Sequence, residues 1–190
     1  MKAGTRIAAV VFTLTAIAHP VKAQSPPALQ PSVWAAKPDL AGFDKSVDEH
    51  LAAADRSLQA LLAVKGERTV DNTLQPFDDA VREIDTAGNL AGLVEMVHPD
   101  AAFRDHGSAA KVKSSAAWTA LNLNPDVYHA LASIDLAGAD AETKYYVELQ
   151  LLESRLAGVD KSPAVRAELK RLNDALTEQI STFERNISDD

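Results

Sequence analysis

The sequence of 190 residues contains no cysteine. This absence excludes a disulfide framework, a cysteine nucleophile and a lipid anchor on a thiol, so the apolar core has to stabilise the fold without cross-links. Other familiar patterns are also missing: the chain has no G-x-S-x-G for a serine nucleophile and neither glycine-rich pattern for binding phosphates. These absences remove several large classes of enzyme.

Basic residues are fewer than acidic ones. The chain has 19 Lys and Arg against 27 Asp and Glu. Three of the basic residues and none of the acidic ones lie in residues 1–23, so without that segment the count is 16 against 27, a net charge of −11. Such an acidic surface repels nucleic acid and anionic membranes, and neither is predicted as a partner.

The N-terminus has the layout of a secretory signal peptide. Lys2 and Arg6 form a positively charged start, residues 7–18 are apolar or weakly polar, and small residues precede a cleavage site after Ala23. The alternative is an uncleaved membrane anchor, but this run is shorter than the roughly 20 residues that cross a bilayer, and Pro20 ends it. The sequence therefore predicts cleavage after Ala23 and a periplasmic or secreted protein with no membrane contact afterwards.

Residues 24–41 contain four prolines and no helical period. This composition predicts a tether or an extended arm that docks through Trp34. From residue 42 to residue 190 no alternation of apolar and polar residues indicates a strand, and strong helix formers dominate. We therefore expect one all-α domain over residues 42–190.

Apolar residues at spacings of three and four predict about six helices, mostly antiparallel, in a bundle. The expected helices cover about 43–64, from a cap at Asn72 or Thr73 to Val97, and then about 100–122, 126–135, 140–156 and 163–187. The first helix has an apolar face made of Phe43, Val47, Leu51, Ala54, Leu58, Leu61 and Leu62. The sixth helix has the most regular face, made of Val165, Leu169, Leu172, Leu176, Ile180, Phe183 and Ile187.

Capping residues support several of these boundaries. Gly66 and Gly158 follow the first and fifth helices, where a residue without a side chain favours a stop. Asp140 begins the fifth helix, and Ser162 caps the sixth with Pro163 in its first position.

Histidine could hold a metal, but its spacing does not favour one. A zincin carries H-E-x-x-H, since two His four residues apart share a helix face, and the chain lacks it. The inverted pattern H-x-x-E-H has a near miss at residues 46–50, where Ser46 stands in the first ligand position and leaves Glu49 alone with His50. Because catalytic zinc needs three protein ligands together, a structural role is expected for His50, His98, His106 and His129.

Acidic residues gather in "FDDAVREID" and "GADAETK". Paired carboxylates serve as general acid and base when burial separates their pKa values. These acids instead fall at helix starts and on polar faces, where they complement the helix dipole. The sequence therefore predicts no catalytic, cofactor-binding or metal-binding residue.

Three stretches carry a family resemblance. They are "RTVDNTLQPFDD" at 68–79, "LNLNPDVYHALASIDLAGADAETKYYVELQLLESRLAGVDKSP" at 121–163, and "LNDALTEQISTFERNISDD" at 172–190. Within them, "NTL-x-P", "VY-x-AL", "R-x-AGV" and "F-x-RNI-x-DD" follow one another in order and spacing. Residues 40–190 thereby resemble the N-terminal helical domain of the thimet oligopeptidase, neurolysin and peptidyl-dipeptidase Dcp family of zinc metallopeptidases.

The resemblance implies a domain that forms one wall of a channel in which short peptides are cleaved. In full-length members zinc lies far downstream on an H-E-x-x-H helix with a further Glu, and the Glu of the motif acts as base toward the bound water. This sequence stops before that half, so no catalytic or metal residue is carried over, and no cofactor is expected in the chain itself.

Three functional hypotheses follow. The first is the N-terminal domain of an exported oligopeptidase-like metalloendopeptidase, truncated before its zinc motif, inactive alone and partnered by the catalytic domain or by short peptides. The second is a stand-alone periplasmic helical module that binds a peptide or a protein. The third is a peptidase assembled from two chains, with H-E-x-x-H on the partner.

Overall fold

The computed structural model describes residues 39–188, so the predicted signal peptide and most of the predicted arm lie outside the described residues. The described part of the chain folds into six α-helices, and the predicted all-α bundle is confirmed. The helices are α1 (Leu40–Ala63), α2 (Gln75–Val97), α3 (Ala101–Asn122), α4 (Pro125–Ala132), α5 (Ala141–Ala157) and α6 (Pro163–Ser188), with a π-helical turn η1 (Val70–Leu74) before α2.

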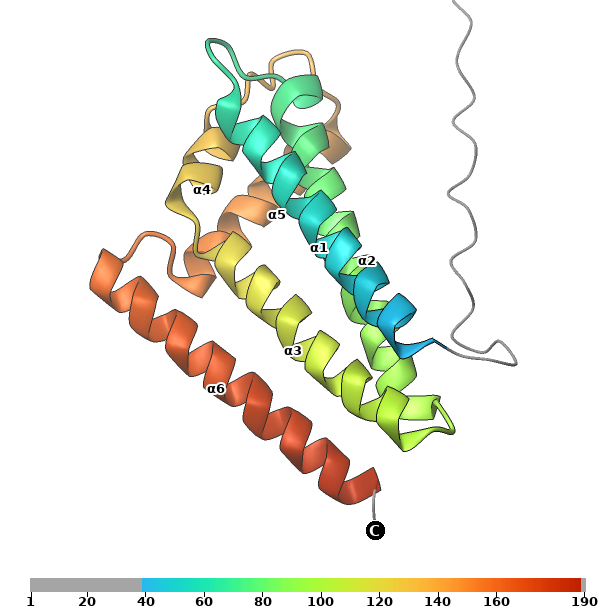
Figure 1. Cartoon of the computed structure of the whole chain (residues 1–190). Coiled ribbons are helices and arrows are strands. Elements are labelled where there is room, and N and C mark those ends of the chain that lie inside the picture. Colours follow the sequence, from blue (N-terminus) through green and yellow to red (C-terminus); the bar gives the residue numbers. More distant parts are fainter. Residues whose placement is uncertain (1–38, 189–190) are drawn as a thin grey trace, which may run out of the picture. The chain divides into compact units, whose positions relative to one another are not determined.

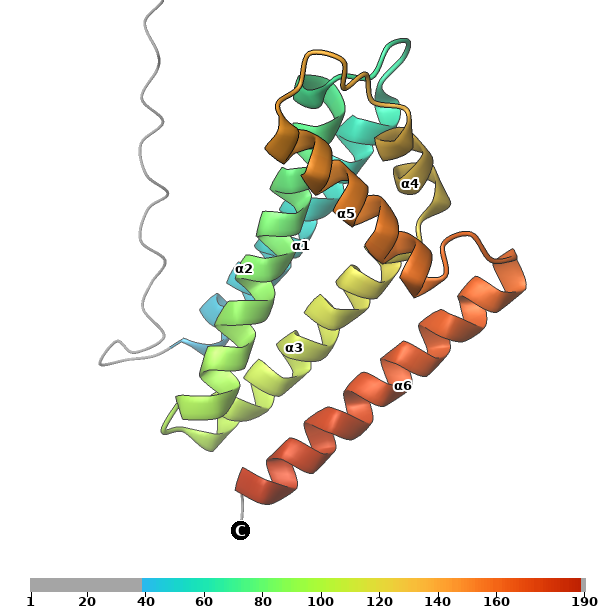
Figure 2. The same ribbon diagram turned by 180° about the vertical axis from the view of Figure 1, so that it is seen from behind.

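Four long helices run side by side in alternating directions. Helices α1, α2 and α3 form consecutive antiparallel pairs, and α6 runs antiparallel to α3 on the side away from α1 and α2 (Figures 1 and 2). Helices α4 and α5 close the end of the bundle at which α1 ends and α2 begins. Helix α3 is therefore the central element, with α2 on one side and α6 on the other.

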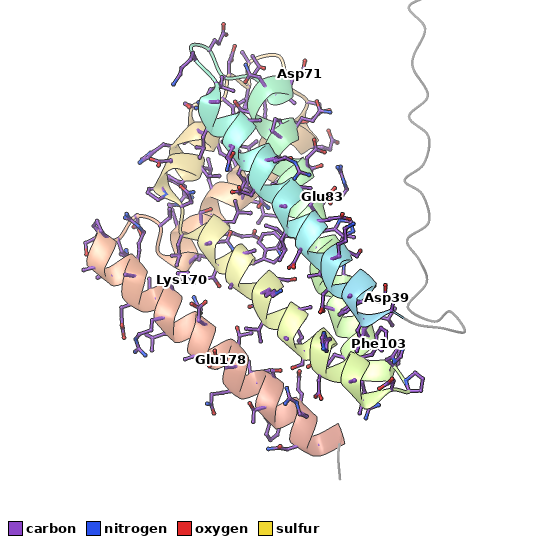
Figure 3. The ribbon with its side chains drawn as sticks, in the orientation of Figure 1. Asp39, Asp71, Glu83, Phe103, Lys170 and Glu178 are labelled. Carbon is purple, nitrogen blue, oxygen red and sulfur yellow. The ribbon has the colours of Figure 1, made fainter. Side chains whose placement is uncertain are left out.

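The core divides into two clusters along α1, α2 and α3. The larger cluster lies toward α4 and α5 and includes Ala54, Leu61, Phe77, Ile84, Leu121, Val127, Leu131 and Val147. The smaller one lies at the opposite end, where Phe43 and Phe103 approach with ring centroids 6.3 Å apart (Figure 3). The apolar face predicted for the first helix is the one that lines both clusters.

Helix α1 begins earlier than the sequence predicts. Its first residue is Leu40, inside the range expected to be an extended arm, because Asp39 caps it by accepting a hydrogen bond from the N–H of Ala41 at 3.1 Å. The helix ends at Ala63, close to the expected boundary, and Gly66 lies in the following loop with a positive φ of 88°.

The start of the second helix differs from the prediction of a cap at Asn72 or Thr73. Thr69 is the capping residue, and it forms a capping box with Asn72: each side chain accepts a hydrogen bond from the other residue's N–H, at 3.2 and 2.8 Å. The capped segment is the π-helical turn 70–74, which continues directly into α2. Pro76 lies in the first turn of α2, as predicted.

Capping residues also fix the later helices. Asp100 and Asp140 cap α3 and α5, in agreement with the expected starts. Asn124 caps α4 and accepts from two backbone N–H groups, and the helix ends at Ala132, so it is shorter than the predicted 126–135.

Two glycines mark places where only a residue without a side chain fits. A Cβ at Gly107 would lie 2.6 Å from the backbone nitrogen of Glu95, so the backbones of α2 and α3 meet at this point. Gly158 ends α5 in the left-handed region with a φ of 104°, and a Cβ on it would lie 2.5 Å from Cδ1 of Leu169.

Candidate functional site on helix α6

Helix α6 packs against α3 through hydroxyl groups. The hydroxyls of Ser108 and Ser181 form a short hydrogen bond, and both residues are almost completely buried. One to two turns away, the hydroxyls of Ser115 and Thr177 are 3.0 Å apart. The contact is thus made by small polar side chains, which let the two helices approach closely.

Charged groups continue the same contact toward the C-terminal end of α6. The Nζ atom of Lys111 lies 2.5 Å from Glu184 and 3.0 Å from Glu95, so one ammonium group joins α2, α3 and α6. Burial lowers the pKa of Lys111, but hydrogen bonds to Glu184 and Glu95 outweigh it and the pKa is raised. Arg185 donates a hydrogen bond to Ser108 at 3.1 Å.

The apolar face of α6 is on the outside. We call its seven residues the α6 stripe: Val165, Leu169, Leu172, Leu176, Ile180, Phe183 and Ile187. Six of them are large exposed side chains, from 45% exposed at Ile180 to 65% at Phe183, while Leu169 packs on Gly158. An amphipathic helix of a globular domain normally turns its apolar face inward, so α6 has the reverse arrangement.

The helical period explains how both faces coexist. At 100° per residue, the residues that bond to α3 (Thr177, Ser181 and Glu184) and the α6 stripe occupy separate sides of the helix. A helix cannot place both sides against α3 at once. The structure places the polar side there and leaves the stripe for another surface.

Further exposed apolar side chains lie on α5 and on α2. On α5, Tyr145, Leu152 and Leu156 recur at spacings of seven and four, so they share one face of that helix, and Leu156 is 78% exposed. At the C-terminal end of α2, Met96 and Val97 are also exposed. The described domain therefore carries apolar surface on three helices, with the α6 stripe as the longest continuous row.

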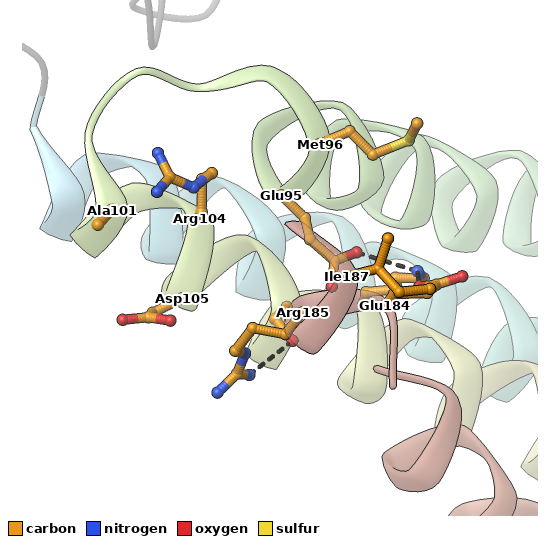
Figure 4. Close-up of a pocket in the computed structure, with 10 residues that line it drawn as sticks. Glu95, Met96, Ala101, Arg104, Asp105, Glu184, Arg185 and Ile187 are labelled. Carbon is orange, nitrogen blue, oxygen red and sulfur yellow. Dashed lines mark hydrogen bonds and ion pairs between the residues drawn. The ribbon is translucent and has the colours of Figure 1, made fainter. Parts of the chain in front are cut away.

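Two cavities border the α6 stripe. One, of about 400 Å³, lies where the ends of α2, α3 and α6 meet, and Figure 4 shows Met96, Arg104 and Ile187 among its lining side chains. The other, of about 220 Å³, lies between α3 and α6, where Leu176 and Ile180 line it. The stripe is thus bordered by two cavities that are lined by both polar and apolar residues.

Two histidines pair with carboxylates on other helices. Nδ1 of His50 lies 2.6 Å from Glu83, which joins α1 to α2 (Figure 3 labels Glu83). Nδ1 of His106 lies 2.9 Å from Asp44, which joins α3 to α1. The sequence did not reveal these partners, because they are 33 and 62 residues away along the chain.

The other two histidines in the described part of the chain have different surroundings. His98 is buried, stacks on Phe103 with ring centroids 4.2 Å apart, and accepts a hydrogen bond from the N–H of Asp100 at 3.1 Å. His129 is exposed, with its ring edge against Tyr128. Within residues 39–188, no three His, Asp or Glu side chains gather closely enough to hold a metal ion.

The acids of "FDDAVREID" do more than occupy a polar face. Asp78 accepts a hydrogen bond from the hydroxyl of Tyr146 at 3.2 Å, and Asp85 accepts one from Nε1 of Trp118 at 3.1 Å. Burial, with the charge of Asp78 beside it, raises the pKa of Tyr146 to about 12. Asp78 lies in the first turn of α2 and both acids are exposed, as expected, and their hydrogen bonds also fasten α2 to α5 and α3. No helix in the described part of the chain is long and apolar enough to cross a membrane.

The four motifs of the family resemblance differ in their structural surroundings. "NTL-x-P" forms the end of η1 and the first turn of α2, "VY-x-AL" buries Val127 and Leu131 in the core, and "R-x-AGV" ends α5 at Gly158. The fourth motif, whose last two residues lie outside the described part of the chain, displays its apolar residues Phe183 and Ile187 to solvent on the α6 stripe. Comparisons with protein-family models and with curated proteins find no match to this chain.

Proposed function

We propose that this domain acts by binding another protein domain, as the N-terminal, channel-wall-forming part of an exported oligopeptidase-like zinc metallopeptidase. The observation that carries the proposal is the α6 stripe, which the domain leaves uncovered along a helix of 26 residues. In this proposal the catalytic domain, with its H-E-x-x-H helix, covers that face.

Energetics support a covered stripe. A large apolar side chain that is half exposed offers on the order of 100 Å² of surface, so six of them reach about 600 Å², the upper end of the range for the largest patch on a soluble monomer. A stand-alone module of this size buries its apolar rows in its own core. A domain evolved beside another one leaves a row for its neighbour, as α6 does.

The family resemblance gives this neighbour an identity. Three of its four motifs form a turn, a core contact and a helix end, which are features that specify the fold. The fourth lies on the exposed end of α6, beside the cavity of about 400 Å³. A surface motif has no packing reason of its own, so its place on the stripe supports contact with a further domain.

A second candidate is a stand-alone periplasmic module that binds a peptide or a protein. The cavity lined by Met96, Arg104, Arg185 and Ile187 favours it, because its volume of about 400 Å³ lies within the range of ligand sites, roughly 300–1,000 Å³. Its lining combines apolar groups with three basic and three acidic side chains, a mixture that can pair with both charged ends of a peptide.

Reading the gene beyond the codon for Asp190 separates the candidates. The proposal expects an H-E-x-x-H motif within a few hundred codons, in frame or after a frameshift. A peptidase assembled from two chains instead expects the motif in a separate gene. If neither place holds it, the proposal is wrong and the binding module takes its place.

An activity measurement tests whether the chain lacks peptidase activity without a catalytic domain. The purified chain, incubated with zinc and a quenched fluorescent oligopeptide, should give no turnover, because no three potential zinc ligands gather in residues 39–188. Turnover that a chelator abolishes, and that persists after further purification, would contradict the proposal.

Export has its own test. In a bacterial host the chain should appear in the periplasmic fraction with Gln24 as its first residue, because a signal peptidase reads the small residues before that position. The mass of the intact protein measures this directly. A chain that keeps Met1 and stays in the cytoplasm would contradict export and leave the binding proposal unaffected.

A further inference from the structure

The α6 stripe is symmetric about its centre. From Val165 to Ile187 the spacings are four, three, four, four, three and four residues, so the pattern reads the same from either end, with Leu176 in the middle. The stripe also repeats every eleven residues, and an 11-residue repeat stays nearly in line with the axis of an α-helix. The apolar row is therefore straight and runs along the whole of α6.

We propose that the stripe is covered by the stripe of a second copy of this chain, lying antiparallel to it about a two-fold axis at Leu176. The inference goes beyond the proposed function, because it concerns the 190-residue chain without a catalytic domain: the second copy then takes the face that the catalytic domain would cover.

Antiparallel pairing places each apolar layer opposite another. Val165 faces Ile187 of the second copy, Leu169 faces Phe183, and Leu172 faces Ile180, while Leu176 meets its own counterpart. A two-fold axis requires such self-complementarity, because the same patch has to serve both partners. A stripe with unequal spacings would place some apolar layers opposite polar ones.

Charge singles out the same helix. Residues 163–188 carry four basic and four acidic side chains, whereas residues 39–162 carry 11 basic and 21 acidic ones, a net charge of −10. Two copies of this acidic domain therefore repel least when they approach through α6.

The α6 stripe is long enough and exposed enough to form a dimer interface. A helix of 26 residues is about 39 Å long, and covering the exposed stripe on both copies removes on the order of 1,000 Å² from solvent, near the lower limit for a specific interface. The polar side of α6 is held on α3 by Ser181 and Thr177, so the stripe stays available to a partner. The dimer should accordingly be reversible on dilution.

The absence of cysteine allows a cross-linking test of the geometry. Leu169→Cys and Phe183→Cys are prepared as separate variants, mixed in equal amounts and treated with a mild oxidant. The mixture should form a disulfide-linked dimer, because the two positions face each other across the two-fold axis. Each variant alone should stay unlinked, since identical positions lie about 21 Å apart along the axis, beyond the 4.4–6.8 Å that a disulfide allows between Cα atoms.

A third cysteine variant serves as the positive control. Leu176→Cys should link to itself, because this residue lies on the axis. If Leu169→Cys alone links as efficiently as the mixture, the helices run parallel and the proposal is overturned.

Light scattering after size exclusion tests whether the dimer exists without a cross-link. The unmodified chain should have twice the mass of one copy at high concentration, and Leu176→Asp should reduce it to the mass of one copy. Thr182→Asp is the matched control, because Thr182 is equally exposed on another side of α6 and should leave the dimer intact. Circular dichroism confirms that each variant is folded.

A chain that remains a monomer throughout a dilution series overturns the inference. That outcome leaves the proposed function standing if an H-E-x-x-H motif follows the Asp190 codon. Conversely, a dimer from a gene with no such motif supports the inference and removes the proposed function, so the two can fail separately.

Discussion

Helices α2 and α6 both pack against α3, and they do so with opposite kinds of surface. Between α2 and α3 the contact is mainly apolar, with the Lys111–Glu95 ion pair and the Trp118–Asp85 hydrogen bond beside it, and so close that Gly107 is needed for the backbones to meet. Between α6 and α3 the contact consists of hydroxyls and ion pairs around Ser108, Ser181 and Lys111. The same central helix therefore holds one neighbour by burial and the other by polar groups.

The two contacts differ in strength. Burying a large aliphatic side chain stabilises a fold by about 1.5–3 kcal/mol, whereas a hydrogen bond contributes about 0.5–1.5 kcal/mol net and a partly exposed ion pair about 0–1 kcal/mol. Helix α6 should therefore open at a lower free energy than α1, α2 and α3. A helix that is weakly held on one side and apolar on the other is suited to gaining its stability from a partner.

The largest loss of stability is expected from a substitution in the apolar core. Ile84, on α2, is 2% exposed in the larger core cluster, so Ile84→Ala should lower the free energy of unfolding by about 2–5 kcal/mol through lost burial and a cavity. Leu156→Ala is the control, because Leu156 is 78% exposed, and it should change stability by less than about 0.5 kcal/mol. Urea denaturation measures both. Equal losses would show that the core is not where the structure places it.

Gly107→Ala should weaken the contact between α2 and α3. Its Cβ meets backbone atoms of Glu95 and Ala91, which cannot turn aside as a side chain can, so the helices have to separate. We expect a loss of about 1–3 kcal/mol, the usual effect of overpacking a core. Thermal denaturation measures it. An unchanged or higher melting temperature would contradict the close approach of the two helices.

The sequence predicts the fold wherever local signals act. The apolar period of α1 and the caps Asp100 and Asp140 are all local, and the helices that depend on them lie close to the expected ranges, apart from the earlier start of α1 at Leu40. The start of α2 could not be predicted, because Thr69 caps a π-helical turn whose wider hydrogen bonding lacks the period of an α-helix. The short α4 ended early for a related reason, since eight residues give too few apolar positions to fix a boundary.

The sequence predicts only part of the candidate site. The regular spacing from Val165 to Ile187 identifies the α6 stripe, but a period cannot say which side of a helix is covered. The choice depends on Ser108 and Lys111, which lie more than 70 residues away and present polar groups to α6. The carboxylate partners of His50 and His106 could not be predicted for the same reason, because contacts between distant segments leave no local pattern.

The polar contact should respond to single hydroxyl groups. Ser181→Ala removes the buried partner of Ser108 and should lower the opening free energy of α6 by about 0.5–1.5 kcal/mol, the net value of one hydrogen bond. Amide hydrogen exchange should then accelerate in α6 and remain unchanged in α2. Thr182→Ala is the control, because that hydroxyl bonds only within α6, to the carbonyl of Glu178. Faster exchange in α2 as well would mean that α6 is part of the same cooperative unit.

The smallest effect has the opposite sign. Gly92 lies in the interior of α2, only one face of which meets α1 and α3, and a Cβ built on it meets no atom within 4 Å. Gly92→Ala should therefore raise the free energy of unfolding by about 0.5–1 kcal/mol, because alanine restricts the unfolded chain and favours the helix. Together with Gly107→Ala it forms a matched pair, the same substitution in two adjacent helices. If both variants lose stability in urea denaturation, the space around Gly92 is occupied, and the side of α2 near Met96 is covered by more than solvent.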